Sequence, residues 1–277
     1  MTSAYTPSRV VSLQPSATVI LAAIGKLDCL AACTKYCADV CPEVKERGIA
    51  IVSDSWTADS KQITQLHPDL VIAAVPYQEK SVGEILKSGA RFFGLAPRTL
   101  ADIYGDIELI ARLMDAAERG IAVVAQMRNA IDAMRVVTRG PSRPRVYCEE
   151  WGNPLIMSQP WVAELIEAAG GQFVGEPGKQ TTAEAILKEA PDVVITAWCG
   201  AGDRVPLERI VGLRNWENMT AVQQRRVFCI SDELLNTPAP TLINGLRALA
   251  FAIHPEIFPH CSGLRSITDV PTLQKEG

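Results

Sequence analysis

The chain has 277 residues, of which 48% are hydrophobic and 21% charged, a balance typical of a soluble globular protein with two lobes or one large domain. Its formal net charge of −4 provides no basic field for a phosphate backbone, so nucleic acid is not an expected partner. No apolar run approaches the roughly 18 residues that cross a bilayer, and no transmembrane segment is predicted.

The amino terminus shows no charged segment followed by an apolar stretch and a small-residue cleavage site. Either a leader was trimmed or the protein is cytoplasmic, and its eight cysteines favour a reducing compartment. Residues 9–25, RVVSLQPSATVILAAIG, then predict a strand, a polar loop and a helix. Proline near the helix start and Gly25 as a left-handed cap mark its two ends.

Four cysteines follow at an interval of four: Cys29, Cys33, Cys37 and Cys41. Pro42 argues against a helix, so residues 30–34 are predicted to be a strand and residues 35–42 its loop. Cys29 and Cys33 would then lie roughly 13 Å apart, too far to share an ion. The other cysteines supply no second pair for structural zinc, so buried, inert thiols are favoured. Thiolates of Cys37 and Cys199 reaching a cofactor metal remain an alternative.

Two similar stretches organise the chain, residues 63–79 and residues 185–203. Each consists of a helix end, a Pro-Asp pair and an apolar strand, with Pro68 and Pro191 at equivalent places. Continuous Val and Ile runs are typical of strands covered on both faces of a parallel sheet. Together with a second strand, loop and helix at residues 145–171, this repeat predicts two α/β lobes.

Residues 99–140 lie between the two lobes and contain apolar residues spaced by three and four, without proline. This spacing predicts a rigid helical connector, in two segments that meet near Gly120. The predicted organisation is therefore an amino-terminal lobe of residues 1–98, a helical backbone of residues 99–140 and a carboxyl-terminal lobe of residues 141–277.

Ligands of parallel sheets bind beyond the carboxyl ends of the strands, and the aromatic residues gather in the segments predicted to follow those ends. These residues are Tyr36, Trp56, Tyr77, Trp151 and Trp198, with Trp161 at the start of a helix. They suggest a wall for a large, partly flat and partly apolar ligand. The alternative is that the rings fill the interface between the lobes.

Two acidic pairs also follow predicted strands, Glu149 with Glu150 and Asp232 with Glu233. Such carboxylates either perform acid/base chemistry, accept hydrogen bonds from ligand amides, or are solvated loop charges. The three histidines have no metal-binding spacing, and the chain shows no nucleophile elbow, phosphate-binding loop or convincing triad. An enzymatic function is therefore not favoured.

The ordered set of stretches VVSLQPSATVILAAIG, TKYCADVCPEV, ITQLHPDLVIAAVPYQEKSVGEILKSG and EEWGNPLIMSQPWVAELIEAAGG resembles the periplasmic cobalamin-binding proteins of ABC importers. The resemblance extends from about Arg9 to Pro255, within a superfamily that includes siderophore and haem receptors. It implies two Rossmann-like α/β lobes joined by one long backbone helix, the fold of class III solute-binding proteins. It also implies a monomer that has no catalytic cofactor.

By resemblance, cobalamin or a related corrinoid would lie in a shallow cleft between the lobes and would be passed to a membrane permease. The residues that would line the cleft are Tyr36, Cys37, Trp56, Pro76, Tyr77, Glu150, Trp151, Trp161, Trp198 and Asp232. The family docks on its permease through one acidic residue per lobe. Glu79 matches the first position, and Asp203 and Glu208 are candidates for the second.

The chain departs from the family pattern in lacking a signal peptide, in its many cysteines and in the segment AVPYQ, residues 74–78. Periplasmic localisation is implied by resemblance, and a cytoplasmic one if Met1 is the native start. The alternative function is therefore a cytoplasmic corrinoid- or metal-binding protein or metalloenzyme. It would use Cys37, Cys199 and the Glu149/Glu150 pair.

Overall fold

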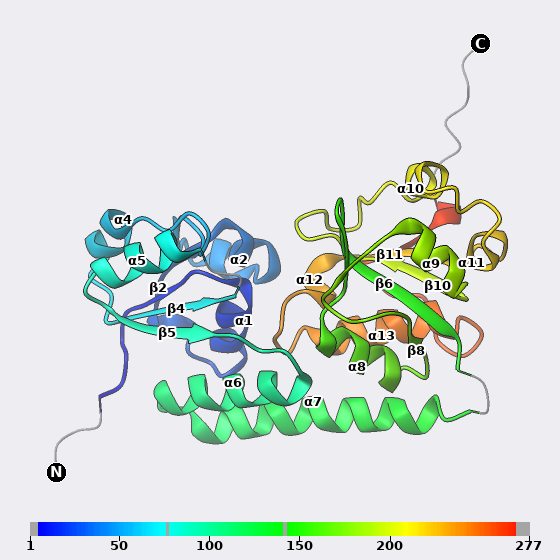
Figure 1. The fold of residues 1–277 in the computed structure, drawn as a ribbon. Helices are drawn as coiled ribbons and strands as arrows, with labels where there is room; N and C mark the ends of the chain where they lie inside the picture. The colour runs from blue at the N-terminus through cyan, green and yellow to red at the C-terminus, as the bar shows by residue number, and fades with distance from the viewer. Residues whose placement is uncertain (1–4, 76–77, 141–142, 270–277) are drawn as a thin grey trace. The chain divides into compact units, whose positions relative to one another are not determined.

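A computed structural model describes residues 5–75, 78–140 and 143–269 (Figure 1). The chain forms two compact α/β units. The first comprises Met1–Arg128 with Pro238–Pro240, and the second comprises Asn129–Thr237 with Thr241–Gly277. The boundary falls within helix α7 (Ala117–Val137), and the predicted three-part division stays a prediction.

The first unit is built on a five-stranded parallel sheet. In spatial order its strands are β3 (Ala50–Val52), β2 (Leu30–Thr34), β1 (Val10–Ser12), β4 (Leu70–Ala74) and β5 (Arg91–Leu95). Its helices are α1 (Pro15–Ala23), α2 (Lys35–Val40), α3 (Glu43–Glu46), α4 (Ser60–Gln65), α5 (Glu79–Lys87) and α6 (Leu100–Leu113), with a 3-10 turn at Leu27–Cys29. Helices α4 and α5 cover one face and α1 and α6 the other (Figure 1).

The second unit is built on a mixed sheet whose central strands are parallel. In spatial order its strands are β12 (Leu264–Ser266), β11 (Val227–Ile230), β10 (Val193–Thr196), β6 (Arg145–Gly152), β7 (Leu155–Met157) and β9 (Gln180–Thr181), with β8 (Gln172–Phe173) also paired to β6. Its helices are α8 (Pro160–Ala168), α9 (Ala183–Glu189), α10 (Leu207–Leu213), α11 (Thr220–Gln223), α12 (Asp232–Leu235) and α13 (Leu242–Ile253), followed by a 3-10 turn at Ile267–Asp269. Helices α8 and α13 lie on one face and α9, α10 and α11 on the other (Figure 1).

The Pro-Asp repeat has the same structural role in both units. In the first, Asp69 accepts a hydrogen bond from the Arg9 backbone N–H at 3.0 Å, and the Arg9 guanidinium donates to the Leu66 carbonyl at 2.8 Å. In the second, Asp192 accepts from the Arg145 backbone N–H at 2.8 Å, and the Arg145 guanidinium donates to a carbonyl at the end of α9. The aspartate thus joins two neighbouring strands, while the proline ends the preceding helix. The two predicted strands are confirmed.

The helices α1 and α8 repeat a second pattern. Each has nine residues and begins with proline at its first turn, and a glycine with positive φ follows two residues after its end. Those glycines are Gly25, with φ +67°, and Gly170, with φ +82°, and both conformations favour a residue without Cβ. The strand, loop and helix predicted at the start of each half are therefore confirmed.

Residues 100–113 and 117–137 form two helices, as expected, but the break between them is not at Gly120. Helix α6 ends at Leu113 and α7 begins at Ala117, so the turn lies at residues 114–116. Gly120 is instead a packing residue, because a Cβ there would lie 2.4 Å from that of Ala111. The sequence suggested glycine as a helix breaker, whereas here it permits two helices to approach closely.

The prediction of a loop at residues 35–42 is wrong, since residues 35–40 form helix α2. The Thr34 hydroxyl accepts a hydrogen bond from the Cys37 backbone N–H at 3.3 Å, which caps the helix start. Pro42 restricts only the residue before it, so a short helix fits upstream. Cys33, Cys37 and Cys41 are buried free thiols and Cys29 is partly buried, so the preference for buried thiols holds for three of the four.

Candidate functional site

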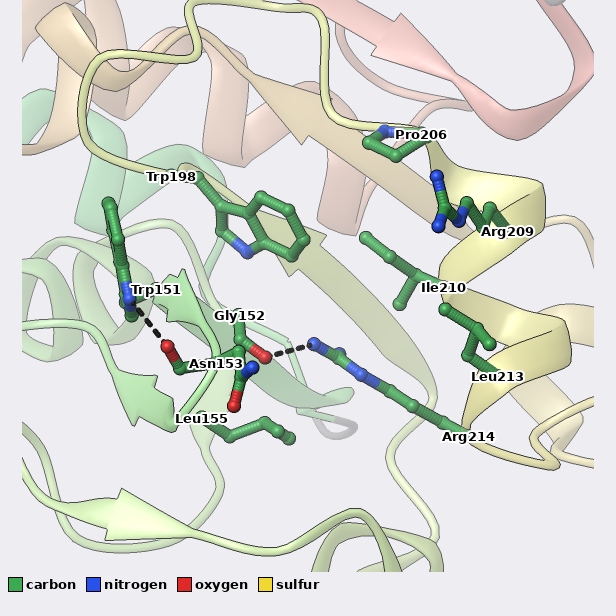
Figure 2. A pocket seen from close by; sticks show the side chains of 10 residues that line it. All are labelled: Trp151, Gly152, Asn153, Leu155, Trp198, Pro206, Arg209, Ile210, Leu213 and Arg214. Carbon is green, nitrogen blue, oxygen red and sulfur yellow. Dashed lines mark hydrogen bonds between the residues drawn. The ribbon is translucent and has the colours of Figure 1, made fainter.

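A pocket opens in the second unit beside the carboxyl end of β6 (Figure 2). It has a volume of about 600 Å³, within the range typical of small-molecule sites. Its apolar walls come from β6, β7, the loop after β10 and helix α10: Trp151, Leu155, Trp198, Pro206, Ile210 and Leu213. Gly152, Asn153, Arg209 and Arg214 complete the lining. Trp151 lies within β6 and not in a loop, which corrects the expectation for this residue.

The two adjacent glutamates of β6 have different hydrogen-bond partners. Glu149 accepts a hydrogen bond from Tyr147 on its own face of β6, whereas Glu150 accepts one from Gln159. The two carboxylates thus have separate hydrogen-bond partners, at a point where the pairing of β6 with β7 is irregular. Glu149 is fully buried, so the alternative of a solvated loop charge does not hold for it.

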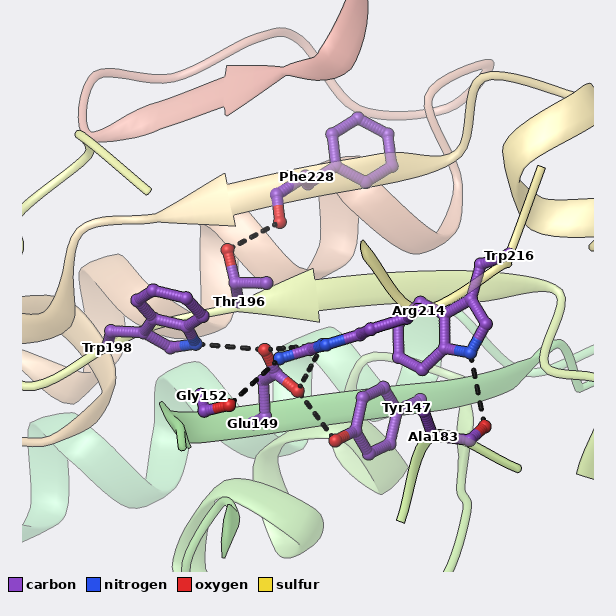
Figure 3. A network of polar contacts seen from close by, with 9 residues as sticks. All are labelled: Tyr147, Glu149, Gly152, Ala183, Thr196, Trp198, Arg214, Trp216 and Phe228. Carbon is purple, nitrogen blue, oxygen red and sulfur yellow. Dashed lines mark hydrogen bonds and ion pairs between the residues drawn. The ribbon is translucent and has the colours of Figure 1, made fainter. Parts of the chain in front are cut away.

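Glu149 is the centre of a buried polar network (Figure 3). It is fully buried and receives donors from three side chains: Tyr147 O–H at 2.6 Å, Trp198 Nε1–H at 2.9 Å and Arg214 Nη1–H at 3.0 and 2.9 Å. Each of these groups is positioned to donate, which suits an ionised carboxylate that accepts only. The buried charge is compensated by Arg214, whose side chain is 9% exposed.

Burial raises the pKa of Glu149, while Arg214 and the hydrogen bonds from Tyr147 and Trp198 oppose that rise. Burial raises the pKa of Glu150 to about 7, against the opposing hydrogen bond from Gln159. The pKa of the Cys199 thiol is raised to about 12, first by desolvation and then by the charges of Glu150 and Asp232. Cys199 is exposed, and the Asn236 side-chain amide donates a hydrogen bond to its sulfur at 3.3 Å.

Asp232 begins helix α12 and its carboxylate is used within the protein. It accepts hydrogen bonds from the backbone N–H groups of Gly200 and Gly202, both at 2.8 Å. The Asp232 carboxylate therefore fixes the turn at residues 200–202, which follows Trp198 in the chain. Asp232 shapes the edge of the predicted ligand surface through this loop.

The first unit by itself has two exposed rings at the carboxyl ends of its strands. Tyr36 in α2 is 42% exposed, and Trp56, in the turn after β3, is 47% exposed. The Trp56 turn is fixed because Asp54 accepts from its N–H at 3.0 Å and Ser81 donates to its carbonyl at 2.6 Å. Pro76 and Tyr77 lie outside the described residues.

Two predicted ligand residues lie in the interior instead. Cys37 is fully buried, its thiol 3.2 Å from the Thr34 hydroxyl. Trp161 is 7% exposed and its indole N–H donates to the Leu235 carbonyl at 2.9 Å. Both sit where a helix starts against its sheet, so helix packing covers them, and the expectation that they face a ligand is corrected.

The three acidic docking candidates are exposed. Glu79 is the first residue of α5, Asp203 lies in the turn after β10, and Glu208 is in the first turn of α10. Within the described ranges, no three His, Cys, Asp or Glu side chains come close enough together to hold a metal ion.

Sequence reasoning missed Tyr147, Gly152, Arg209 and Arg214, which surround the pocket and its network. The Arg214 guanidinium crosses from the end of α10 to β6, 65 positions earlier in the chain. No motif marks such a contact. The only available signal was Glu149 itself, a charge inside an apolar strand, which requires a buried partner.

Comparison with known proteins identifies the family. The family model described as periplasmic binding protein matches residues 10–234. The chain belongs to the periplasmic binding protein family. A cobalamin-binding protein of Halobacterium salinarum is 24% identical over 258 residues, which are 90% of this chain and 70% of that protein. A vitamin B12-binding protein of Vibrio cholerae is 24% identical and covers 88% of both chains.

The fold agrees with this family. A periplasmic heme binding protein from Pseudomonas aeruginosa superposes with a TM-score of 0.81 at 18% identity, over 94% of this chain and 98% of that one. The predicted class III binding-protein fold is confirmed, and so is the expectation of a non-enzymatic solute-binding protein of an ABC transporter. The metalloenzyme alternative is thereby set aside. Among the described residues, the structure contains no helix of the length and apolarity that a bilayer crossing requires.

Proposed function

We propose that the protein binds cobalamin or a related corrinoid outside the cytoplasm and delivers it to an ABC permease. The observation that carries this proposal is the match to cobalamin-binding relatives along 90% of the chain. The exposed rings of Tyr36 and Trp56 in one unit and Trp151 in the other support it. Rings of this size can supply the flat apolar contacts that a macrocycle requires.

Haem is the second candidate, because the haem-binding protein from Pseudomonas aeruginosa shares the fold. Both ligands are flat macrocycles with an apolar surface, and both suit aromatic contacts. They differ at their edges, since haem carries two carboxylates and cobalamin carries mainly amides. Glu150, with its pKa raised to about 7, can donate or accept a hydrogen bond near neutral pH and suits an amide edge.

A titration with three metal macrocycles tests the proposal. Cyanocobalamin, dicyanocobinamide and haemin are added to the purified protein while tryptophan fluorescence and heat are recorded. We expect saturable quenching by a corrinoid at one site per chain. Trp56→Ala and Trp151→Ala should each weaken binding about tenfold, in line with the loss of one aromatic contact. Tyr5→Ala, another exposed ring, is the control and should bind normally.

If haemin binds tightly and neither corrinoid changes the fluorescence, haem is the ligand, and the proposed role in transport is unaffected. Flat titrations with all three compounds would contradict the proposed ligand class. Unchanged affinity in both tryptophan variants would show that the ligand surface lies elsewhere.

Docking on the permease is proposed to use Glu79 on the first unit and either Asp203 or Glu208 on the second. Glu79 also suits the amino-terminal end of α5, where a carboxylate stabilises the helix dipole, and the two roles are compatible. Glu79→Ala should leave macrocycle affinity intact and reduce capture by the reconstituted permease. Glu46→Ala, an exposed acid in α3, is the control. Loss of ligand affinity in Glu79→Ala would refute the docking role.

A further inference from the structure

The pocket beside β6 has one wall whose position is set by the fold. The Trp198 indole N–H donates to the buried Glu149, and the ring lies over the Gly152 backbone (Figures 2 and 3). A Cβ at Gly152 would come within 2.1 to 2.6 Å of three indole atoms. The ring can therefore occupy this place only because residue 152 is glycine. Such a wall is organised before any ligand arrives, which lowers the cost of binding.

The charges around the pocket are not balanced. Arg214 is neutralised by Glu149 at 2.9 Å and also approaches the Gly152 carbonyl at 3.4 Å. Arg209, near the start of α10, lines the same pocket, and its guanidinium has no ion pair or hydrogen bond among the described residues. The pocket lining thus combines apolar walls with one uncompensated positive charge.

We propose that this pocket is a binding site for an aromatic group that carries one negative charge. The ring would contact the Trp198 indole and the apolar side chains of Ile210 and Leu213, and its anion would face Arg209. A cavity of about 600 Å³ accepts a group of two or three fused or linked rings. Glu149 acts as a positioning residue, because it holds Trp198 without lining the pocket itself.

This inference rests on the proposed function for its biological role, since Trp151 and Trp198 also belong to the predicted macrocycle surface. Its test does not depend on any macrocycle. A matched pair of fluorescent probes separates the aromatic contribution from the charge. These are 8-anilinonaphthalene-1-sulfonate, a monoanion, and N-phenyl-1-naphthylamine, the same ring system without the sulfonate.

We expect the wild-type protein to bind both probes at one saturable site, with the anion bound roughly fivefold tighter, as for a solvent-exposed ion pair. Arg209→Gln should remove that difference and leave the neutral probe unchanged. Arg247→Gln, an exposed arginine on α13, is the matched control and should preserve the difference.

Trp198→Ala should weaken both probes roughly tenfold. Gly152→Ala should do the same by displacing the ring, and Trp198→Phe, which retains a ring, should lose less. Equal affinity for the two probes in the wild type, or a charge preference that survives Arg209→Gln, would overturn the assignment of Arg209. Full binding of both probes by Trp198→Ala would overturn the pocket. A failed corrinoid titration alongside normal probe binding would refute the proposed ligand and leave this site standing.

Discussion

Glu149→Gln is the most direct test of the buried network. The substitution keeps the side-chain volume but removes the charge opposite Arg214, whose side chain is 9% exposed. Three side chains donate hydrogen bonds to Glu149, so the site requires acceptor atoms only. Glutamine would place an N–H₂ donor among these donors. Removing one member of a buried ion pair costs about 3–5 kcal/mol, because the other charge stays buried and unpaired. We expect the free energy of unfolding of the second unit to fall by that amount.

Urea denaturation followed by tryptophan fluorescence measures this loss, because Trp151, Trp161, Trp198 and Trp216 all lie in the second unit. Arg145 on the same strand β6 and Glu189 at the end of α9 provide the matched control, an ion pair in which both side chains are well exposed. Glu189→Gln should cost no more than about 1 kcal/mol.

Replacement of both buried charges by apolar residues provides the second control. Glu149→Leu with Arg214→Met should recover most of the stability lost in Glu149→Gln, because neither charge is then left without its partner. The account of the network would be refuted if Glu149→Gln and Glu189→Gln cost the same. It would also be refuted if the double variant were less stable than Glu149→Gln.

Three further predictions concern other parts of the fold. Because the folded pKa of Glu150 is raised from 4.5 to about 7, its contribution to stability is present below about pH 4.5 and lost as pH rises through 7. The free energy of unfolding of Glu150→Gln should therefore equal that of the wild type at pH 4.5 and exceed it at pH 8 by at most about 3 kcal/mol. A difference in the free energy of unfolding that is the same at both pH values would contradict this. Gly120→Ala should lower the free energy of unfolding by about 1–3 kcal/mol through the clash with Ala111, whereas Gly105→Ala, in α6 with open space around it, should raise it by about 0.5–1 kcal/mol. Thermal unfolding of that pair would show equal shifts if the close packing were absent. Thr99→Ala should cost about 1 kcal/mol in the same assay, since Thr99 caps α6 in a capping box, and no loss would contradict that role.

Much of the fold was determined by local sequence. The Pro-Asp pairs at residues 68–69 and 191–192, together with proline starts and glycine ends of α1 and α8, were sufficient to predict two related α/β lobes. These signals act over a few residues: a missing N–H, a fixed φ or a left-handed cap has the same consequence in any context. The helical character of residues 99–137 follows from apolar spacing alone, in the same way.

Other features depended on contacts between distant segments. Whether Gly120 breaks a helix or allows a close approach depends on Ala111 in another helix. The helix at residues 35–40 is a different case, because its Thr34 cap is a local signal that the sequence analysis missed. Both Cys37 and Trp161 proved to be buried, so neither belongs to the predicted ligand surface.

The pocket shows this division most clearly. The sequence by itself determined that tryptophans lie near strand ends and that Glu149 interrupts an apolar strand. Only the tertiary structure decided that Trp198 rests on Gly152, that Arg214 neutralises Glu149, and that Arg209 has no partner within the part of the chain that the structure describes. The physical reason is that a buried charge must be compensated somewhere, but which residue compensates it depends on the packing of a helix against a strand and leaves no local pattern in the chain.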